Sequence, residues 1–195
     1  MIPLTWLAPV AEELRSSVVQ IRHGGSGAAG VRWGPEGKFI TNAHVVHRGR
    51  VTVIRPDGVS VPGEVVRMDQ VRDLALVQAD LDVPRVRAGD PGILRPGALV
   101  FAVGHPMGVT EAVSAGIFQA VGPMPHGFPL SEHGRGLRWV QADIRLAPGN
   151  SGGPIADAFG RVVGIVAMIM GGLALAVPAN DVQAFLSEAL HGAAT

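Results

Sequence analysis

The chain has 195 residues and a formal net charge of zero, with 16 basic and 16 acidic side chains, and it contains no cysteine. The balanced charge removes the electrostatic reason to expect nucleic acid or an anionic membrane as a partner, and the lack of cysteine excludes disulfides, thiolate nucleophiles and cysteine-based metal sites. The 27 glycines and 15 prolines, against 47% hydrophobic residues, indicate a turn-rich globule rather than a disordered chain.

The N-terminal segment predicts a short helix and no targeting signal. Trp6, Val10 and Leu14 recur four residues apart, which indicates an amphipathic helix over Leu4–Leu14. The stretch from Met1 to Val10 has no basic residue ahead of its apolar part and no cleavage pattern, so no signal peptide is expected. The compartment stays open between the cytoplasm and an extracytoplasmic location reached with a leader since removed. No apolar run reaches the roughly 18 residues of a membrane helix, so no membrane span is expected.

Beyond this helix, short apolar-rich segments recur, each closed by Gly, Pro, Asn or Asp, as is typical of strands bounded by turns. The segments are Val18–Arg22, Ala28–Trp33, Phe39–Thr41, Val51–Arg55, Val59–Val66, Leu74–Gln78, Leu99–Val103, Thr110–Val121, Trp139–Asp143, Val162–Met170 and Leu173–Val177. Helices do not alternate with them as they would in a parallel sheet, so we expect an all-β barrel or sandwich.

Turn-forming residues divide these strands. Pro56-Asp57-Gly58 predicts a tight turn between two Val-rich segments. Gly171-Gly172 predicts a hairpin in which Met170 faces Leu173. A cluster of Gly, Pro and Asp over Ala88–Pro96 marks a soft boundary, so the strands fall into two groups of similar size.

The last segment with a clear helical pattern follows the final predicted strand. Asn180 suits the N-cap of this helix. The residues that fall on its apolar face are Val182, Phe185, Leu186 and Ala189.

The segment Pro148-Gly149-Asn150-Ser151-Gly152-Gly153-Pro154 carries the clearest chemistry. Its glycines let the backbone approach a reacting carbonyl closely and adopt unusual angles. The backbone N–H groups of Gly149 and Ser151 are then candidates for an oxyanion hole. The Ser151 hydroxyl is a poor nucleophile without a base that a third group orients. Taken alone, the segment is also compatible with an ordinary turn.

His44 and Asp73 are the candidates for that base and its orienting acid. His44 follows a predicted strand, and Asp73 stands immediately before an apolar one. The order is His, then Asp 29 residues later, then Ser151 after 78 more, which is the order of chymotrypsin-type triads. His44 and His47 are three residues apart, but no third ligand accompanies them, so no metal site is expected.

Seven stretches resemble, in the same order, those of the trypsin-like serine peptidases, and most closely the protease domain of the HtrA family. They are Gly25–Gly27, Thr41–Val46, Asp73–Leu76, Val103–Gly108, Gln141–Asp143, Gly149–Pro154 and Ala176–Asn180. The resemblance implies two six-stranded antiparallel β-barrels, with a short N-terminal helix and a C-terminal helix, around a shared active-site cleft. His44 and Asp73 would come from the first barrel and Ser151 from the second, and no cofactor is needed.

The same resemblance implies a single peptidase domain over residues 1–195. The first barrel is expected at about 16–90, the second at about 96–178 and the C-terminal helix at 179–191. The HtrA family usually carries PDZ domains after the protease, but only 44 residues follow Ser151, so none is expected in this sequence. The family's Gly-Asn-Pro-Phe-Gly stretch reads Gly104-His105-Pro106-Met107-Gly108 here, and a homo-oligomer is not indicated.

The resulting hypothesis is a serine endopeptidase that acts on unfolded or flexible protein segments through a His44–Asp73–Ser151 triad and an acyl-enzyme. By resemblance, the specificity pocket is lined by Arg145, Leu146, Ala147, Val166, Ala167 and Met168. Their mostly apolar character favours a small or medium aliphatic residue before the cut, whereas Arg145 pointing into the pocket would select an acidic one. Two alternatives stay open: a catalytically silent peptide-binding module, and a latent protease whose oxyanion hole forms when the Gly- and Pro-rich loop Gly122–Arg138 becomes ordered.

Overall fold

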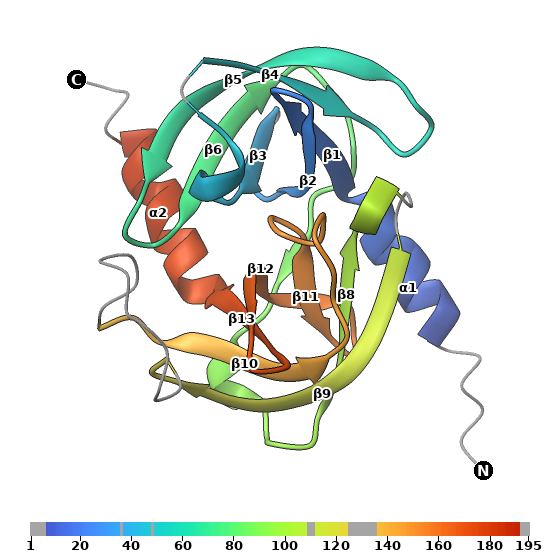
Figure 1. Ribbon diagram of the computed structural model, residues 1–195, viewed down its shortest axis with the longest axis vertical. Coiled ribbons are helices and arrows are strands. Elements are labelled where there is room, and N and C mark those ends of the chain that lie inside the picture. The colour runs from blue at the N-terminus through green and yellow to red at the C-terminus, as the bar shows by residue number, and fades with distance from the viewer. Residues whose placement is uncertain (1–6, 36, 48, 109–111, 125–135, 192–195) are drawn as a thin grey trace.

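The computed structural model describes residues 7–35, 37–47, 49–108, 112–124 and 136–191, and it contains two barrels of strands with an α-helix near each end of the chain (Figure 1). Six strands close the first barrel in the order β1-β2-β3-β6-β5-β4. Their bounds are β1 (Val18–His23), β2 (Ser26–Arg32), β3 (Lys38–Thr41), β4 (Gly49–Ile54), β5 (Ser60–Asp69) and β6 (Leu74–Ala79).

The second barrel has the order β11-β8-β9-β10-β13-β12 and closes because β11 also pairs with β12. Its strands are β8 (Leu99–Gly104), β9 (Ala112–Gly122), β10 (Trp139–Ile144), β11 (Pro154–Asp157), β12 (Arg161–Met170) and β13 (Leu173–Pro178). The predicted pair of six-stranded antiparallel barrels is therefore confirmed. A two-residue strand that the sequence did not predict, β7 (Arg87–Ala88), adds a parallel pairing to β12.

Strand β6 is buried on both faces and links the first barrel to the rest of the molecule. Ala75 and Val77 lie in the core of the first barrel, whereas Leu74 and Leu76 belong to a second cluster shared with the helix α2 (Ala179–His191). The second barrel contributes to that cluster the side chains Trp139, Ile165 and Leu175. Because burying one such side chain stabilises a fold by about 1.5–3 kcal/mol, this shared core fixes the placement of the two barrels.

Both terminal helices are present, and the first of them begins at a different residue from the one predicted. The helix α1 spans Leu7–Ser16, against a predicted Leu4–Leu14 whose first three residues lie outside the described part of the chain. The N-cap prediction for Asn180 is wrong because α2 begins at Ala179, and the Asn180 amide instead donates to Asp90 Oδ1 at 3.3 Å. Within the described residues, neither helix is long and apolar enough to cross a membrane.

The two predicted turns are confirmed, but one strand of the second barrel was not predicted. The Arg55 N–H donates to Val59 O at 2.8 Å, which closes the turn at Pro56-Asp57-Gly58. Met170 pairs with Leu173 across the Gly171-Gly172 hairpin. Strand β11 has only four residues and begins at the proline that ends the glycine-rich run, so its sequence resembles a turn more than a strand.

Candidate active site

His44 and Asp73 meet because two paired strands end beside each other. His44 lies in a single 3-10 turn, Ala43–Val45, that directly follows β3. Asp73 immediately precedes β6, the antiparallel neighbour of β3, and Thr41 pairs with Ala75 at this end of the ladder. The two side chains therefore emerge at one edge of the first barrel although 29 residues separate them in the sequence.

Two hydrogen bonds join these residues. Asp73 Oδ2 lies 2.7 Å from His44 Nδ1, and Asp73 Oδ1 accepts the backbone N–H of His44 at 2.9 Å. A proton on Nδ1 leaves Nε2 of the neutral ring as an acceptor. The side chain of His44 is 47% exposed and that of Asp73 only 12%, so the imidazole faces outward with the carboxylate behind it.

The backbone of Asp73 is strained. Its φ is 55°, in the left-handed region, which costs a non-glycine residue about 1–2 kcal/mol. The buried Asn42 supports this conformation, because its Nδ2 donates to Asp73 O at 3.0 Å. Strain of this kind persists only where the surroundings over-determine it, and it is concentrated at functional sites.

Ser151 lies where the two barrels touch. Its carbonyl accepts the N–H of Ala29, which belongs to β2 of the first barrel, at 2.9 Å. The next residue, Gly152, donates to Val166 O in β12 at 2.9 Å. A Cβ on Gly152, which has a φ of 81°, would lie 2.0 Å from Ala29 O, so only glycine fits there. The segment that contains Ser151 is therefore held by both barrels at once.

The Ser151 hydroxyl contacts β12, a strand that also lines the hollow beside His44 and Asp73. Its Oγ donates to Ala167 O at 3.4 Å, and no hydrogen bond joins it to the His44 ring within the described residues. Ala167 lines the same hollow as His44 and Asp73, so the imidazole and the residue that accepts the hydrogen bond of the Ser151 hydroxyl border one space. A serine has three staggered side-chain rotamers, and catalytic hydrogen bonds often shorten only when substrate binds.

The backbone around Ser151 leaves two N–H groups unpaired. Three carbonyls of the segment are held by N–H donors: Pro148 by Met107 at 3.1 Å, Gly149 by His105 at 3.1 Å, and Asn150 by Gly153 at 3.0 Å. In a trans peptide the C=O and the following N–H point in opposite directions. The N–H groups of Gly149 and Ser151 are therefore turned away from these donors, and neither has an acceptor among the described residues. Two such donors are what an oxyanion hole requires.

His105 supports this segment from behind. It is only 4% exposed, and its side chain hydrogen-bonds the backbone of Val19 in β1. Gly149 has a φ of 103°, and a Cβ there would lie 2.3 Å from His105 O, so the two backbones are in close contact. Burial lowers the pKa of the His105 imidazole. The neutral ring therefore links the first barrel to the loop that carries the candidate oxyanion donors.

Acidification is expected to destabilise the protein through His105. Because burial lowers its folded-state pKa below the ordinary 6.5, the unfolded chain binds more protons as the pH falls below that value. The free energy of unfolding then decreases in this window and is unaffected by His105 at higher pH. Urea unfolding of His105→Asn and the wild type, at several pH values between about 7.5 and 5, measures this contribution.

The expected result is a smaller loss of stability on acidification for His105→Asn. The exposed His47 provides the matched control, since His47→Asn is expected to keep the wild-type dependence on pH. Equal pH dependence in all three proteins would contradict the role of His105.

Of the six predicted specificity residues, three precede the segment that contains Ser151 and the other three lie in β12. Arg145 is exposed and forms no ion pair with the described residues. Leu146 packs against the core of the second barrel, and the Ala147 carbonyl accepts two hydrogen bonds from Asn150, at 2.9 and 3.1 Å. Val166, Ala167 and Met168 belong to β12, and the first two are each 2% exposed.

A hollow of about 310 Å³ lies beside His44. Ala167 and Met168 are the predicted pocket residues that line it, together with the triad candidates His44 and Asp73. The sequence did not predict the other three lining residues, Gln70, Val71 and Trp139. Gln70 and Val71 precede Asp73 by three and two residues, but nothing in their identity distinguishes them from ordinary turn residues.

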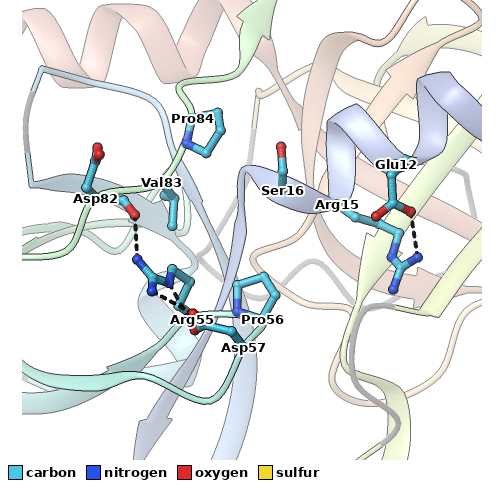
Figure 2. A pocket seen from close by; sticks show the side chains of 9 residues that line it. All are labelled: Glu12, Arg15, Ser16, Arg55, Pro56, Asp57, Asp82, Val83 and Pro84. Carbon is cyan, nitrogen blue, oxygen red and sulfur yellow. Dashed lines mark hydrogen bonds and ion pairs between the residues drawn. The ribbon is translucent and has the colours of Figure 1, made fainter.

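A second hollow, of about 300 Å³, lies between the end of α1 and the first barrel (Figure 2). Its charged side chains are paired: Arg55 with Asp57 at 2.6 Å, Arg15 with Glu12 at 2.8 Å, and Asp82 with Arg32, which lies outside the hollow, at 2.8 Å. The hydrogen bonds from Arg55 lower the pKa of Asp57 to about 2. Because its charged side chains are paired and it holds none of the triad candidates, this hollow is not the candidate active site.

A family model and several relatives match most of this chain. Residues 16–165 match the family model described as a trypsin-like peptidase domain. The putative serine protease HhoB of Synechocystis sp. is 34% identical over 153 residues, which cover 76% of this chain and 36% of HhoB. Serine protease HTRA1A of Danio rerio is 32% identical over 157 residues, covering 78% of this chain and 32% of that protein. The chain therefore spans about a third of the length of these relatives.

Solved structures show a similar fold. The HtrA-type protease AlgW with a decapeptide superposes with a TM-score of 0.83 at 23% identity, over 95% of this chain and 67% of that one. An AlgW variant with a tripeptide gives a TM-score of 0.84 at 27% identity, over 95% of this chain and 64% of that one.

Proposed function

The chain belongs to the trypsin-like peptidase domain family, and on that premise we propose that it is a serine endopeptidase that cleaves unfolded or flexible protein segments. The observation that carries the proposal is the pair of hydrogen bonds between Asp73 and His44, at 2.7 and 2.9 Å. This pair borders the same hollow as Ala167, the partner of the Ser151 hydroxyl. A base that a buried acid orients is what makes a serine hydroxyl nucleophilic.

In the proposed mechanism, Ser151 Oγ attacks the carbonyl carbon of the peptide bond while His44 Nε2 takes its proton. Asp73 holds the proton on Nδ1 and stabilises the imidazolium that forms. The N–H groups of Gly149 and Ser151 donate to the tetrahedral oxyanion, and losing one such donor typically costs about 2.7–4 kcal/mol. His44 then protonates the leaving amine, and a water that His44 deprotonates releases the acyl group from Ser151.

Strand β12 offers an edge to which a substrate can add. Strand β11 pairs with it no further than Ile165, and the register with β13 shifts between Val166 and Met168. From Ala167 onward, the side of β12 away from β13 pairs with no strand among the described residues. An extended peptide hydrogen-bonds to such an edge by strand addition. The peptides named with both AlgW structures support a peptide ligand here as well.

The hollow beside His44 favours an apolar side chain of the substrate. Its lining includes the apolar side chains of Val71, Trp139, Ala167 and Met168, and no described lysine or arginine lines it. Aliphatic and aromatic linings of this kind bind ligands mainly by removing apolar surface from water.

A serine-reactive phosphonate and a denatured protein substrate together test the proposal. We expect the probe to label Ser151, and mass spectrometry of casein digests to identify internal cuts. Heat-denatured protein provides the control for labelling, because only the folded triad activates Ser151. Absence of both labelling and cleavage would favour the catalytically silent alternative. The loop proposed for latency, Gly122–Arg138, lies mostly outside the described residues.

Replacing Arg145 by alanine is expected to leave the cleavage preference unchanged, with an aliphatic residue before the cut. The reason is that Arg145 is exposed and no described acidic side chain orients its guanidinium. A peptide-library profile of Arg145→Ala and wild type measures the preference, with the exposed Arg22→Ala as the matched control. An acidic preference in the wild type that disappears in Arg145→Ala alone would overturn this expectation.

A further inference from the structure

The turn that carries Asp73 is closed by an arginine at the preceding position. Arg72 donates its backbone N–H to Asp69 Oδ1 at 2.8 Å and its Nε to Asp69 Oδ2 at 2.6 Å. Asp69 ends β5 and Asp73 precedes β6, so one carboxylate fixes both the backbone and the side chain of Arg72 inside this turn. The other end of the guanidinium remains available for a different partner.

That partner is the helix α2, which lies 116 residues further along the chain. Arg72 donates from both terminal nitrogens to the two carboxylate oxygens of Glu188, one of them at 3.0 Å. Its guanidinium carbon also lies 5.6 Å from the centroid of the Phe185 ring. The planar guanidinium of Arg72 therefore binds two carboxylates and stacks on a ring. Its position is far more defined than that of a lysine ammonium group would be at the same place.

The part of α2 that Arg72 contacts is firmly packed in the core. Phe185 is fully buried, and Val182 and Leu186 on the same helix are at most 2% exposed. The hydrogen bonds from Arg72 lower the pKa of Glu188 and raise that of Arg72. Burial works against the ionised Asp69, yet the hydrogen bonds from Arg72 still lower its pKa. All three groups are therefore charged at neutral pH.

Asp73 requires such support more than its neighbours do. Its φ of 55° is one of only two positive values outside glycine among the described residues. Relaxing this backbone would rotate the carboxylate, whose two oxygens bond the ring and the backbone of His44. Arg72, joined to Asp73 by a peptide bond, is placed to resist that relaxation.

We propose that Arg72 is a positioning residue for the triad: anchored on α2 through Glu188, it holds Asp73 in the conformation in which its carboxylate meets His44. The inference rests on the proposed peptidase function, and it adds that the last helix supports catalysis. Since Glu188 is 48% exposed, its pair with Arg72 adds little to stability, so a kinetic effect of breaking it is separable from unfolding.

The test compares Arg72→Gln, Arg72→Lys and Glu188→Gln in the full chain. We expect Arg72→Gln to lower kcat by about tenfold with little change in KM, since displacement of a catalytic group affects mainly the chemical step. Arg72→Lys keeps the charge without the fork and is expected to fall in between. Glu188→Gln is expected to lower kcat by about threefold, a modest loss because Asp69 still holds Arg72. Glu13→Gln, which breaks the exposed pair between Glu13 of α1 and Arg87 of β7, is the matched control and is expected to keep wild-type kcat.

A second readout does not depend on turnover. The proton between His44 Nδ1 and Asp73 gives a low-field ¹H NMR signal when the two groups are held together, and we expect it to weaken in Arg72→Gln and Glu188→Gln. Wild-type kcat and an unchanged signal in both variants would overturn the proposal, and so would equal losses in Glu13→Gln. If the wild type cleaves nothing and is not labelled by the phosphonate, the peptidase function fails, while the NMR signal still tests the positioning role.

Discussion

Substituting Ser151 by alanine is expected to lower kcat on a peptide substrate by about a million-fold while the protein stays folded. The alanine has no hydroxyl to form the acyl-enzyme, and the remaining groups only bind and polarise the substrate. The Ser151 hydroxyl contributes little to the fold, because the hydrogen bond that it donates to Ala167 O is long, at 3.4 Å. We therefore expect a loss of at most about 1 kcal/mol in the free energy of unfolding.

Turnover and thermal unfolding measured on the same preparation test this expectation. Ser187→Ala is the matched control, since Ser187 also donates to a carbonyl, at 2.9 Å from Gln183 O, but lies on α2. It is expected to retain wild-type kcat. Substantial peptidase activity in Ser151→Ala would remove the assigned nucleophile, and with it the proposed mechanism.

Replacing Asp73 by asparagine is expected to lower kcat by about ten-thousand-fold with little effect on stability. The amide nitrogen of asparagine donates to His44 Nδ1, which places the ring proton on Nε2, and that nitrogen then has no lone pair to accept the proton of Ser151. Asparagine tolerates the left-handed φ of 55° at this position, so the backbone conformation is retained. Asp73→Asn therefore separates the effect on kcat from any effect on the backbone conformation.

Steady-state kinetics and urea unfolding of Asp73→Asn measure the two effects. Asp80→Asn serves as the control, because Asp80 is an exposed carboxylate just after β6. A rate within tenfold of the wild type in Asp73→Asn would mean that another group orients the base.

The sequence predicted the parts of the fold that depend on local patterns. Alternating apolar segments and turn residues located most strands, and the apolar face of α2 was correct at Val182, Phe185, Leu186 and Ala189. The order of His44, Asp73 and Ser151 indicated the chemistry because each residue type has a defined role in acyl transfer. The strand β7 was missed because it has only two residues, and β11 because it begins at the proline that ends a glycine-rich run and so resembles a turn.

What the sequence did not predict depends on segments that meet only in the folded chain. Trp139 and Val71 line one hollow although 68 residues separate them. Arg72 and Glu188 are 116 residues apart, and no periodicity relates them. The burial of His105 between the barrels likewise follows from the contact of β1 with the loop after β8, which no local propensity encodes.

The bond between Ala29 and Ser151 has a consequence for the newly made chain. The nucleophile segment needs Ala29 from the first barrel and Val166 from β12, which is made after Ser151. During synthesis the first barrel folds ahead of the second, so His44 and Asp73 are paired while their nucleophile is still unanchored. In the proposed mechanism, peptidase activity therefore requires the second barrel to have closed and docked.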